Sequence, residues 1–330
     1  MPNFKELVVK YTEDDSIYSD VIPILQNEAK DAPVAIMYQP EFITIMNFFR
    51  AFLQENEYSN RALICCKDAI ACNPANYTAW VYLRSCLEKL NCNLYDELKY
   101  CDQMGKDHPK NYQLWNHRRK LVEILYKNKK QDDTININKL VLNELKSIED
   151  ALQRDTKNYH VWSYRQWLVH YFNNYTQEIS FIDKMLNDDI RNNSAWNHKY
   201  FVNKETTNFN KDFIDEELLK IMKLIELDIH NDSSWRYLEG FFQLEHFNLQ
   251  DHGTVIISFS QNILNNNDEK CINALSLLVE LCILYIKNND TNMEEKINKK
   301  ELASTYLLKL SNYDEIRKMY WLDRLNNLPN

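Results

Sequence analysis

The sequence has 330 residues, a formal net charge of −9 and only three glycines. Tight β-hairpins, dinucleotide-binding turns and phosphate-binding loops need glycine for positive φ or close backbone approach, so this composition favours helices joined by short polar loops. The net negative charge, without a long run of Lys and Arg, argues against a nucleic-acid partner. Hydrophobic residues make up 45% of the chain, enough for a buried core.

The N-terminal sequence MPNFKELVVKYTEDD lacks the basic start and apolar core of a secretory signal, so we expect a cytoplasmic protein. An apolar pattern of helical period at Ala62, Cys65, Cys66, Ala69 and Ile70 predicts an amphipathic helix. Pro74 should end this helix, as Pro109 should end a later one.

A tryptophan-centred motif follows and recurs along the chain. Five tryptophans stand at intervals of 35, 47, 34 and 39 residues, each four positions after an asparagine: Asn76 and Trp80, Asn111 and Trp115, Asn158 and Trp162, Asn192 and Trp196, Asn231 and Trp235. Asparagine before an apolar helical pattern is a natural N-cap, so each motif predicts the start of a helix with tryptophan in its first turn.

The third residue after the tryptophan is basic in the middle three repeats, where it is Arg118, Arg165 and Lys199. A lysine preserves the charge of arginine but cannot form its planar, two-pronged hydrogen bond. We therefore expect Lys199 to form a weaker salt bridge between repeats.

Polar stretches separate the repeats. Residues 126–139, YKNKKQDDTININK, lack apolar periodicity and predict a surface loop, as do the Asn-rich tracts at 173–174, 265–267 and 288–289. Histidines 117, 160, 170 and 198 have no metal-ligand spacing and are expected to face solvent or an interface.

The longest apolar stretch, Ala274 to Ile286, is interrupted by Ser276 and Glu280. It is too short to cross a bilayer, so it predicts a buried helix, and we expect no transmembrane segment. The eight cysteines show neither a C-x-x-C pair nor zinc-type Cys/His spacing. They predict free, mostly buried thiols and no metal site in this chain.

An amphipathic helix precedes each motif helix, as in the stripe Leu218, Ile221, Met222 and Ile225. Each repeat should therefore be a helical hairpin, and tandem hairpins stack into an all-α, crescent-shaped superhelix, or solenoid. We expect a lead-in segment over 1–34 and a single repeat domain over 35–330. Periodicity alone does not indicate catalysis, since many such arrays are binding scaffolds.

The repeated Asn-Tyr-x-x-Trp-x-x-Arg motif resembles that of protein prenyltransferase α subunits. NYQLWNHRRKLVEIL (111–125), KNYHVWSYRQWLVHYF (157–172) and RNNSAWNHKYFV (191–202) are similar to successive repeats of the α subunit shared by farnesyltransferase and type I geranylgeranyltransferase. The resemblance extends to residues 41–70 and to the C-terminal segment YDEIRKMYWLDRL (313–325), and so covers nearly the whole chain.

This resemblance implies a heterodimer in which the chain wraps around a catalytic β subunit that carries zinc. The implied reaction uses magnesium and transfers a farnesyl or geranylgeranyl group from its diphosphate to the cysteine of a C-terminal CaaX motif. A Rab-type geranylgeranyltransferase α subunit is the nearest alternative. A non-catalytic helical-repeat scaffold, soluble without a β subunit, is the third.

The resemblance also assigns candidate site residues. Lys157 matches a lysine that reaches the isoprenoid diphosphate, and a point cation there would stabilise charge on the leaving group. Tyr159 matches a tyrosine near the same site, although Tyr77 and Tyr112 at the same repeat position suggest a packed tyrosine instead. Gln113 matches a glutamine that contacts the CaaX carboxylate.

Three further residues, Arg165, Asn192 and Trp196, match family positions that support activity. We interpret their roles as mainly structural. Asn192 should cap a helix, Trp196 should fill the space between hairpins, and Arg165 should pair with a carboxylate or with backbone carbonyls.

Overall fold

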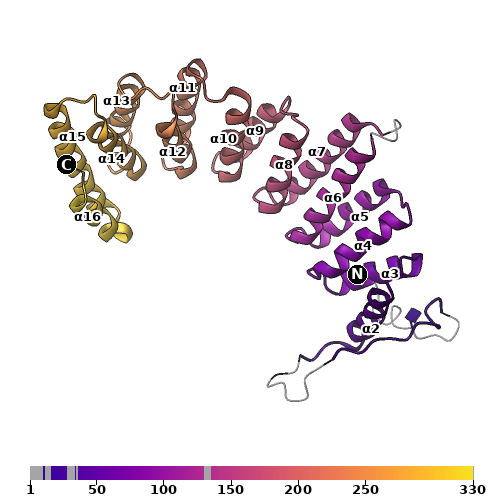
Figure 1. Ribbon diagram of the computed structural model, residues 1–330. Coiled ribbons are helices and arrows are strands. Elements are labelled where there is room, and N and C mark those ends of the chain that lie inside the picture. The colour runs from indigo at the N-terminus through magenta and orange to yellow at the C-terminus, as the bar shows by residue number, and fades with distance from the viewer. Residues whose placement is uncertain (1–9, 12–15, 28–33, 35, 130–134, 330) are drawn as a thin grey trace. The chain divides into compact units, whose positions relative to one another are not determined.

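A computed structural model describes residues 10–11, 16–27, 34, 36–129 and 135–329. These residues form α-helices and two short 3₁₀ helices, and no strand occurs among them. The chain divides into two compact units, Met1–Phe172 and Asn173–Asn330. Each unit is a stack of helical hairpins, so the predicted all-α solenoid architecture is confirmed (Figure 1).

Unit 1 contains one helix followed by three hairpins, in which α3 pairs with α4, α5 with α6 and α7 with α8. Its helices are α2 (Pro40–Glu55), α3 (Asn60–Cys72), α4 (Tyr77–Lys89), α5 (Leu94–Asp107), α6 (Tyr112–Asn128), α7 (Ile137–Arg154) and α8 (Tyr159–Tyr171). As predicted, α3 and α5 end before Pro74 and Pro109.

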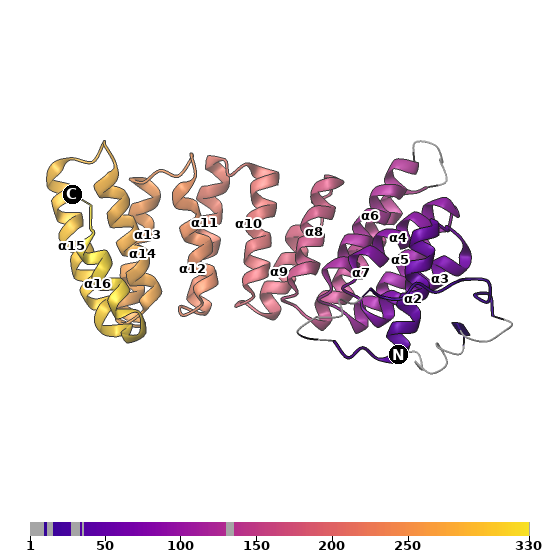
Figure 2. The same ribbon diagram turned by 60° about the horizontal axis from the view of Figure 1, so that its bottom comes forward.

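Unit 2 is likewise built from paired helices (Figure 2). Its elements are α9 (Glu178–Asp188), α10 (Asn193–Thr207), α11 (Lys211–Leu227), α12 (Asp232–Glu239), η1 (Gly240–Gln243), α13 (Asp251–Asn266), α14 (Ile272–Lys287), α15 (Met293–Tyr313), η2 (Glu315–Arg317) and α16 (Lys318–Asn326). Most apolar side chains of α14 are buried, which confirms the helix predicted over Ala274 to Ile286.

The motif asparagine has two structural roles. Its side-chain oxygen caps the helix that follows, as predicted; Asn158 Oδ1, for example, accepts the backbone N–H groups of His160 and Val161. In Asn111, Asn158 and Asn231 the amide also donates to a carbonyl of the preceding repeat, at 3.0 Å from Asn158 Nδ2 to Pro109 O. The same Pro109 carbonyl accepts the indole N–H of Trp115 at 3.1 Å.

This arrangement recurs, because Asn111 and Trp80 share the carbonyl of Pro74 and Asn231 and Trp196 share that of Ile190. The Asn-x-x-x-Trp spacing thus places two donors, from consecutive repeats, on one carbonyl oxygen. The motif fixes both the helix start and the register of the next hairpin.

Replacing Asn158 with Asp separates these two roles. The Asp carboxylate can still accept the backbone N–H groups that form the cap. It cannot donate to the carbonyl of Pro109, so two acceptor oxygens would face each other there. We expect a loss of about 1–3 kcal/mol in the free energy of unfolding, measured by urea titration. Asn136→Asp is the matched control, because Asn136 caps α7 and its amide nitrogen has no bond to another repeat among the described residues. Equal effects of the two substitutions would contradict the inter-repeat role.

Buried carboxylates join the two helices of a hairpin. Four glutamates each bond a side chain twenty positions later, in the pairs Glu97 and His117, Glu144 and Tyr164, Glu178 and His198, Glu217 and Tyr237. In two repeats, the basic residue three positions after the tryptophan also bonds a glutamate of the next hairpin. Arg118 donates two hydrogen bonds to Glu144 of the next hairpin, from Nε at 2.6 Å and from Nη2 at 2.9 Å.

Lys199 forms the corresponding contact in unit 2, with its Nζ 3.0 Å from Glu217 Oε1. A single ammonium contact replaces the two-pronged bond of Arg118, which agrees with the expected difference between lysine and arginine. The pairs Arg118–Glu144 and Lys199–Glu217 are almost completely buried. Each charge is therefore stabilised in the interior by its partner of opposite sign.

The prediction that His117 and His198 face solvent or an interface is wrong, because both lie inside a hairpin. Both side chains are fully buried, because each imidazole completes a glutamate pair inside its hairpin. His117 Nε2 lies 3.3 Å from Glu97 Oε1, and His198 Nε2 lies 2.6 Å from Glu178 Oε2. Burial lowers the pKa of His117 and favours its neutral form.

Two predicted loops are shorter than expected. Helix α6 continues to Asn128 and α7 begins at Ile137, so the predicted loop over 126–139 is wrong at both ends, and residues 130–134 lie outside the described part. Helix α13 extends to Asn266 into the tract at 265–267. The loops at 173–174 and 288–289 are confirmed, as are eight free cysteines, most of them buried.

Two described tyrosines of the lead-in segment pack against the first helices of unit 1. Tyr11 and Tyr18 are buried and stack with ring centroids 4.4 Å apart, and Tyr11 donates to Asp68 of α3 at 2.6 Å. Tyr18 also packs against Phe48 of α2. These contacts supply the apolar cover that the first helices of a stack lack on their outer side. The division into a lead-in over 1–34 and a domain over 35–330 stays a prediction.

Candidate functional site

The predicted substrate-contacting residues all belong to unit 1. Gln113 lies in the first turn of α6, Tyr159 is the first residue of α8, and Lys157 stands directly before the cap of α8. The supporting residues are divided, with Arg165 in α8 and the pair Asn192 and Trp196 at α10 in unit 2.

Gln113 lines a shallow hollow of about 570 Å³ where the loops before α4 and α6 meet. Its backbone N–H donates to Asn111 Oδ1 at 2.8 Å, which fixes the first turn of the helix, and its side chain is half-buried. The hollow is lined by Asn73, Pro74, Ala75, His108, Pro109, Lys110, Asn111, Tyr112 and Gln113. A half-buried amide in such a hollow can donate to a carboxylate.

Lys157 and Tyr159 lie at the start of α8. The backbone N–H of Lys157 donates to Asp155 Oδ1 at 3.3 Å, and its side chain is exposed. Tyr159 is 76% exposed, and the equivalent Tyr77 and Tyr112 are 67% and 62% exposed. None of the three tyrosines fills the core, so the alternative of a packed repeat tyrosine is wrong.

Two residues in the hollow were not selected from the sequence. Lys110 and Tyr112 flank the cap of α6 as Lys157 and Tyr159 flank the cap of α8. Lys110 Nζ lies 3.5 Å from Asp155 Oδ2, and the rings of Tyr112 and His160 lie 6.2 Å apart. The two Lys-Asn-Tyr segments are therefore neighbours. Because residues 110–112 and 157–159 have the same sequence, Lys-Asn-Tyr, the sequence could have indicated Lys110 and Tyr112 as candidate site residues.

The electrostatics of this edge of unit 1 favour anions. Helices α4, α6 and α8 all begin here, and the N-terminus of a helix carries partial positive charge. Lys110 and Lys157 add two formal charges, of which Lys110 is partly offset by Asp155. Exposed phenol groups beside the lysines supply neutral donors. Such an edge can bind a phosphate or a carboxylate.

The three supporting residues are built into the core. Arg165 is 1% exposed and its Nη1 lies 3.7 Å from Glu149 Oε1. Asn192 caps α10 by accepting the backbone N–H groups of Ser194 and Ala195. The indole of Trp196 is buried and donates to Ile190 O at 2.7 Å.

Among the described residues, no group of three or more His, Cys, Asp and Glu side chains is placed to hold a metal ion. No helix in the same part of the chain is long and apolar enough to cross a membrane.

Comparisons with known proteins identify the repeat. The sequence profile described as "Protein prenyltransferase alpha subunit repeat" matches residues 59–90, 94–125, 141–172 and 175–205. These ranges cover the hairpins from α3–α4 to α9–α10, each with its cap asparagine and tryptophan. The class defined by this fold is therefore that of prenyltransferase α subunits.

Relatives that match nearly the whole chain identify the type of prenyltransferase α subunit. The α subunits of protein farnesyltransferase/geranylgeranyltransferase type-1 from Candida albicans and Pisum sativum are each 32% identical, over 96% and 97% of this chain and 99% and 98% of theirs. A solved structure, Candida albicans protein geranylgeranyltransferase-I complexed with GGPP, matches with a TM-score of 0.81 and 30% identity, over 96% of this chain and 100% of that one. The chain belongs to the family of type-1 farnesyltransferase/geranylgeranyltransferase α subunits.

Proposed function

We propose that this chain is the α subunit of a heterodimeric protein prenyltransferase that attaches a farnesyl or geranylgeranyl group to the cysteine of C-terminal CaaX motifs. The observation that carries the proposal is the end-to-end match to type-1 α subunits at 32% identity. The type-2 α subunit of Saccharomyces cerevisiae is only 25% identical over 82% of the chain, which favours the type-1 activity.

The proposal assigns zinc to the β subunit and magnesium to the diphosphate. Zinc binding by protein normally uses Cys, His, Asp and Glu side chains, and the described part of this chain gathers no such group. What zinc supplies in such a reaction is a substrate thiolate, the nucleophilic form of cysteine. The α subunit is left with binding and orienting the two substrates.

The residues at the start of α6 and α8 suit that task. As the C–O bond to the isoprenoid breaks, negative charge accumulates on the diphosphate, and Lys157 is proposed to stabilise it together with a hydrogen bond from Tyr159. Gln113 is proposed to donate its amide N–H to the carboxylate at the end of the CaaX peptide. Lys110 and Tyr112 offer the same chemistry one repeat earlier, beside Gln113.

Reconstitution tests the proposed activity. The chain is co-expressed with a farnesyltransferase-type β subunit from the same organism, and the purified pair is given farnesyl diphosphate and a CaaX peptide. Mass spectrometry should show one farnesyl group on the peptide cysteine and none on a peptide with serine in its place. A stable pair that is inert toward CaaX peptides would instead support the type-2 activity.

The two equivalent lysines allow a matched test of the diphosphate site. We expect Lys157→Ala to lower kcat by about 100-fold with little change in the KM for peptide, because the lost cation acts mainly on the leaving group. Lys110→Ala is the control, assayed on the same intact heterodimer. If only Lys110→Ala lowers kcat, the lysine that stabilises the diphosphate is the one before α6. If both variants keep full activity, neither lysine stabilises the diphosphate.

A further inference from the structure

Asp155 lies between the two Lys-Asn-Tyr segments at the start of α6 and α8. It is the C-cap residue of α7 and stands three positions before the cap Asn158. Its Oδ1 accepts the backbone N–H of Lys157 at 3.3 Å, and its Oδ2 lies 3.5 Å from Lys110 Nζ. One carboxylate therefore contacts the lysine of each segment, through the backbone in one and through the ammonium group in the other.

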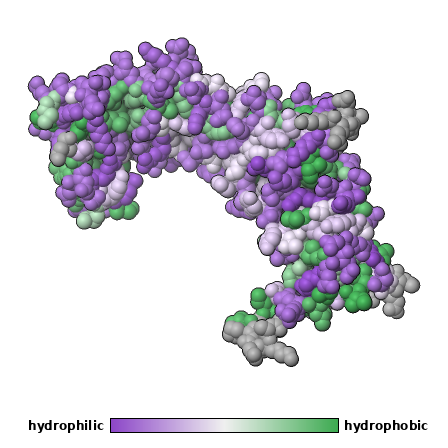
Figure 3. Space-filling view, viewed as in Figure 1, coloured by the Kyte–Doolittle hydropathy of each residue, from purple (hydrophilic) through white to green (hydrophobic). Residues whose placement is uncertain are grey.

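An exposed ion pair is by itself weak evidence for a role. Hydrophilic residues cover much of each unit in the view of Figure 3, and the side chain of Lys110 is 77% exposed. Water and salt screen the attraction between such groups. The pair between Asp155 and Lys110 is informative only if the repeat itself specifies it.

The same arrangement recurs in unit 2. Asp228 stands three positions before the cap Asn231, and its Oδ1 accepts the backbone N–H of His230 at 3.2 Å. Its carboxylate also accepts two bonds from Arg191, at 2.5 Å from Nε and 3.1 Å from Nη2. Arg191 directly precedes the cap Asn192 of the previous motif helix, as Lys110 directly precedes the cap of α6.

A third copy follows before α14. Asp268 Oδ1 accepts the backbone N–H of Lys270 at 3.0 Å, and Asp268 Oδ2 lies 3.5 Å from His230 Nε2. In each copy the aspartate fixes the turn before one helix and pairs with the basic residue before the previous motif helix. The repeat thus specifies this contact, and the pair between Asp155 and Lys110 is one instance of it.

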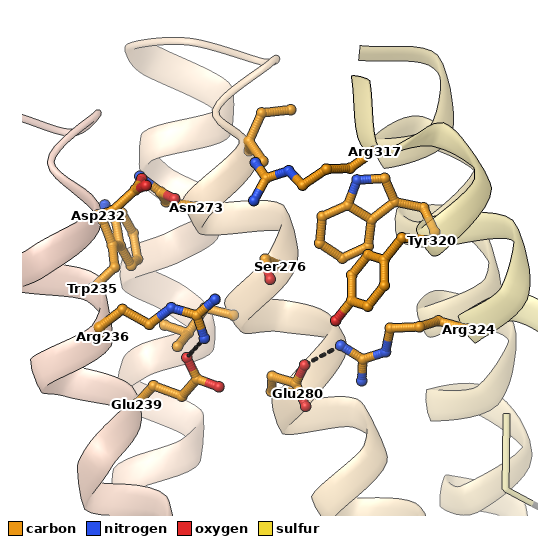
Figure 4. Close-up of a pocket in the computed structure, with 13 residues that line it drawn as sticks. Asp232, Trp235, Arg236, Glu239, Asn273, Ser276, Glu280, Arg317, Tyr320 and Arg324 are labelled. Carbon is orange, nitrogen blue, oxygen red and sulfur yellow. Dashed lines mark hydrogen bonds and ion pairs between the residues drawn. The ribbon is translucent and has the colours of Figure 1, made fainter. Parts of the chain in front are cut away.

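The charged pairs of a pocket in unit 2 have a different geometry. Between α12, α14 and α16, Arg236 bonds Glu239 of its own helix, and Arg324 of α16 bonds Glu280 of α14 (Figure 4). These two pairs join side chains of helix bodies. The aspartates join the segments that precede helix caps, where the candidate substrate-contacting residues lie.

The contact with Asp155 limits where the Lys110 ammonium group can lie. A lysine side chain is long and flexible, and restricting it before a ligand binds reduces the entropy that is lost on binding. The ammonium group has three N–H donors, so it can stay on Asp155 and still donate to a phosphate oxygen. The same carboxylate fixes the turn before α8 and with it the backbone of Lys157.

We propose that Asp155 is a positioning residue for the proposed isoprenoid transfer. It holds the Lys110 ammonium group at the start of α8 and fixes the turn that carries Lys157, so that both lysines face one diphosphate. Asp155 acts through these lysines and is not itself a catalytic residue. The assignment rests on the proposed function, which supplies the diphosphate.

Kinetics of the intact heterodimer test this role. Asp155→Asn keeps the acceptor for the N–H of Lys157 and removes the charge that holds Lys110. We expect kcat to fall by about tenfold. The Kd for farnesyl diphosphate should not increase, because the removed carboxylate had repelled that anion. Asp155→Glu should recover part of kcat, since it keeps the charge.

A double-mutant cycle shows whether Asp155 acts through Lys110. In the Lys110→Ala background, Asp155→Asn should lower kcat no further. Asp228→Asn is the matched control, because it breaks the equivalent pair with Arg191 in unit 2 and should leave kcat unchanged. Thermal unfolding of each heterodimer identifies a variant that fails to fold.

Three results would overturn this inference alone: an unchanged kcat in Asp155→Asn, an equal loss in Asp228→Asn, or a loss that adds in full to that of Lys110→Ala. A raised Kd for farnesyl diphosphate together with a lower Tm would assign Asp155 a merely structural role and would also overturn it. If the unchanged heterodimer transfers no farnesyl group, the proposed function fails and this inference falls with it.

Discussion

Replacing Arg118 with alanine is expected to lower the free energy of unfolding of unit 1 by about 3–5 kcal/mol, because it leaves a buried glutamate without its cation. Arg118 bonds Glu144 through two nitrogens and Asp102 through a third, at 2.5 Å. Tyr164 adds a bond to Glu144 at 2.6 Å, but a neutral phenol cannot balance the carboxylate charge. Urea titration of the isolated chain measures the loss.

Arg118→Lys is the matched variant, because Lys199 already shows how a lysine serves at this position. Arg118→Lys should lower the free energy of unfolding by less than half as much as Arg118→Ala, since the positive charge remains and only the two-nitrogen hydrogen bond to Glu144 is lost. Hydrogen exchange should locate the loss of protection in α6 and α7, where the pair joins two hairpins. A cost of Arg118→Ala below about 1 kcal/mol would show that Glu144 finds water or another partner.

Replacing Trp196 with alanine is the second large effect and concerns unit 2. The indole is 1% exposed, lies 5.2 Å from the ring of Tyr237 and donates to Ile190 O. Removing a buried aromatic side chain of this size costs about 3–5 kcal/mol. Because repeats are stabilised mainly by their neighbours, exchange protection should fall first in α10 and α12.

Trp196→Phe separates packing from hydrogen bonding. The phenyl ring keeps part of the apolar contact with Tyr237, while Ile190 O retains the bond from Asn231 at 2.8 Å. We therefore expect it to cost about 1–2 kcal/mol, well below the alanine variant. Equal costs for the two variants would mean that the hydrogen bond, and not the buried ring, provides the stability.

The helix starts could be predicted because their signal is local. Asparagine caps, the prolines before them and the apolar stripes act within a few residues, and the structure confirms the caps at Asn76, Asn111, Asn158, Asn192 and Asn231. The second bond of these side chains could not be predicted, because the accepting carbonyl lies in another repeat. Asn158 and Pro109, for example, are 49 positions apart.

The buried glutamates were missed for a different reason. Charged residues are usually exposed, so Glu97 and Glu178 gave no sign of burial when considered singly. Their constant distance of twenty positions from His117 and His198 was a usable signal, and it would have placed these histidines inside the hairpins. Polar pairs buried between helices are visible in a sequence only as a repeated spacing.

The candidate site was only partly accessible to sequence reasoning. The match to a family motif identifies a position within a repeat. Three repeats have the sequence Asn-Tyr at that position, so the motif alone does not distinguish between them. The structure brings the Lys-Asn-Tyr segments of α6 and α8 side by side and adds Lys110 and Tyr112 to the hollow that Gln113 lines.

The central claim is that this chain acts only as one half of a prenyltransferase. The most direct test is a titration of the chain into a fixed concentration of a farnesyltransferase-type β subunit, with the rate of farnesyl transfer to a CaaX peptide as readout. The account predicts no transfer by either subunit alone and a rate that saturates at equimolar ratio. Full activity of the β subunit without the chain, or no transfer at any ratio, would contradict it.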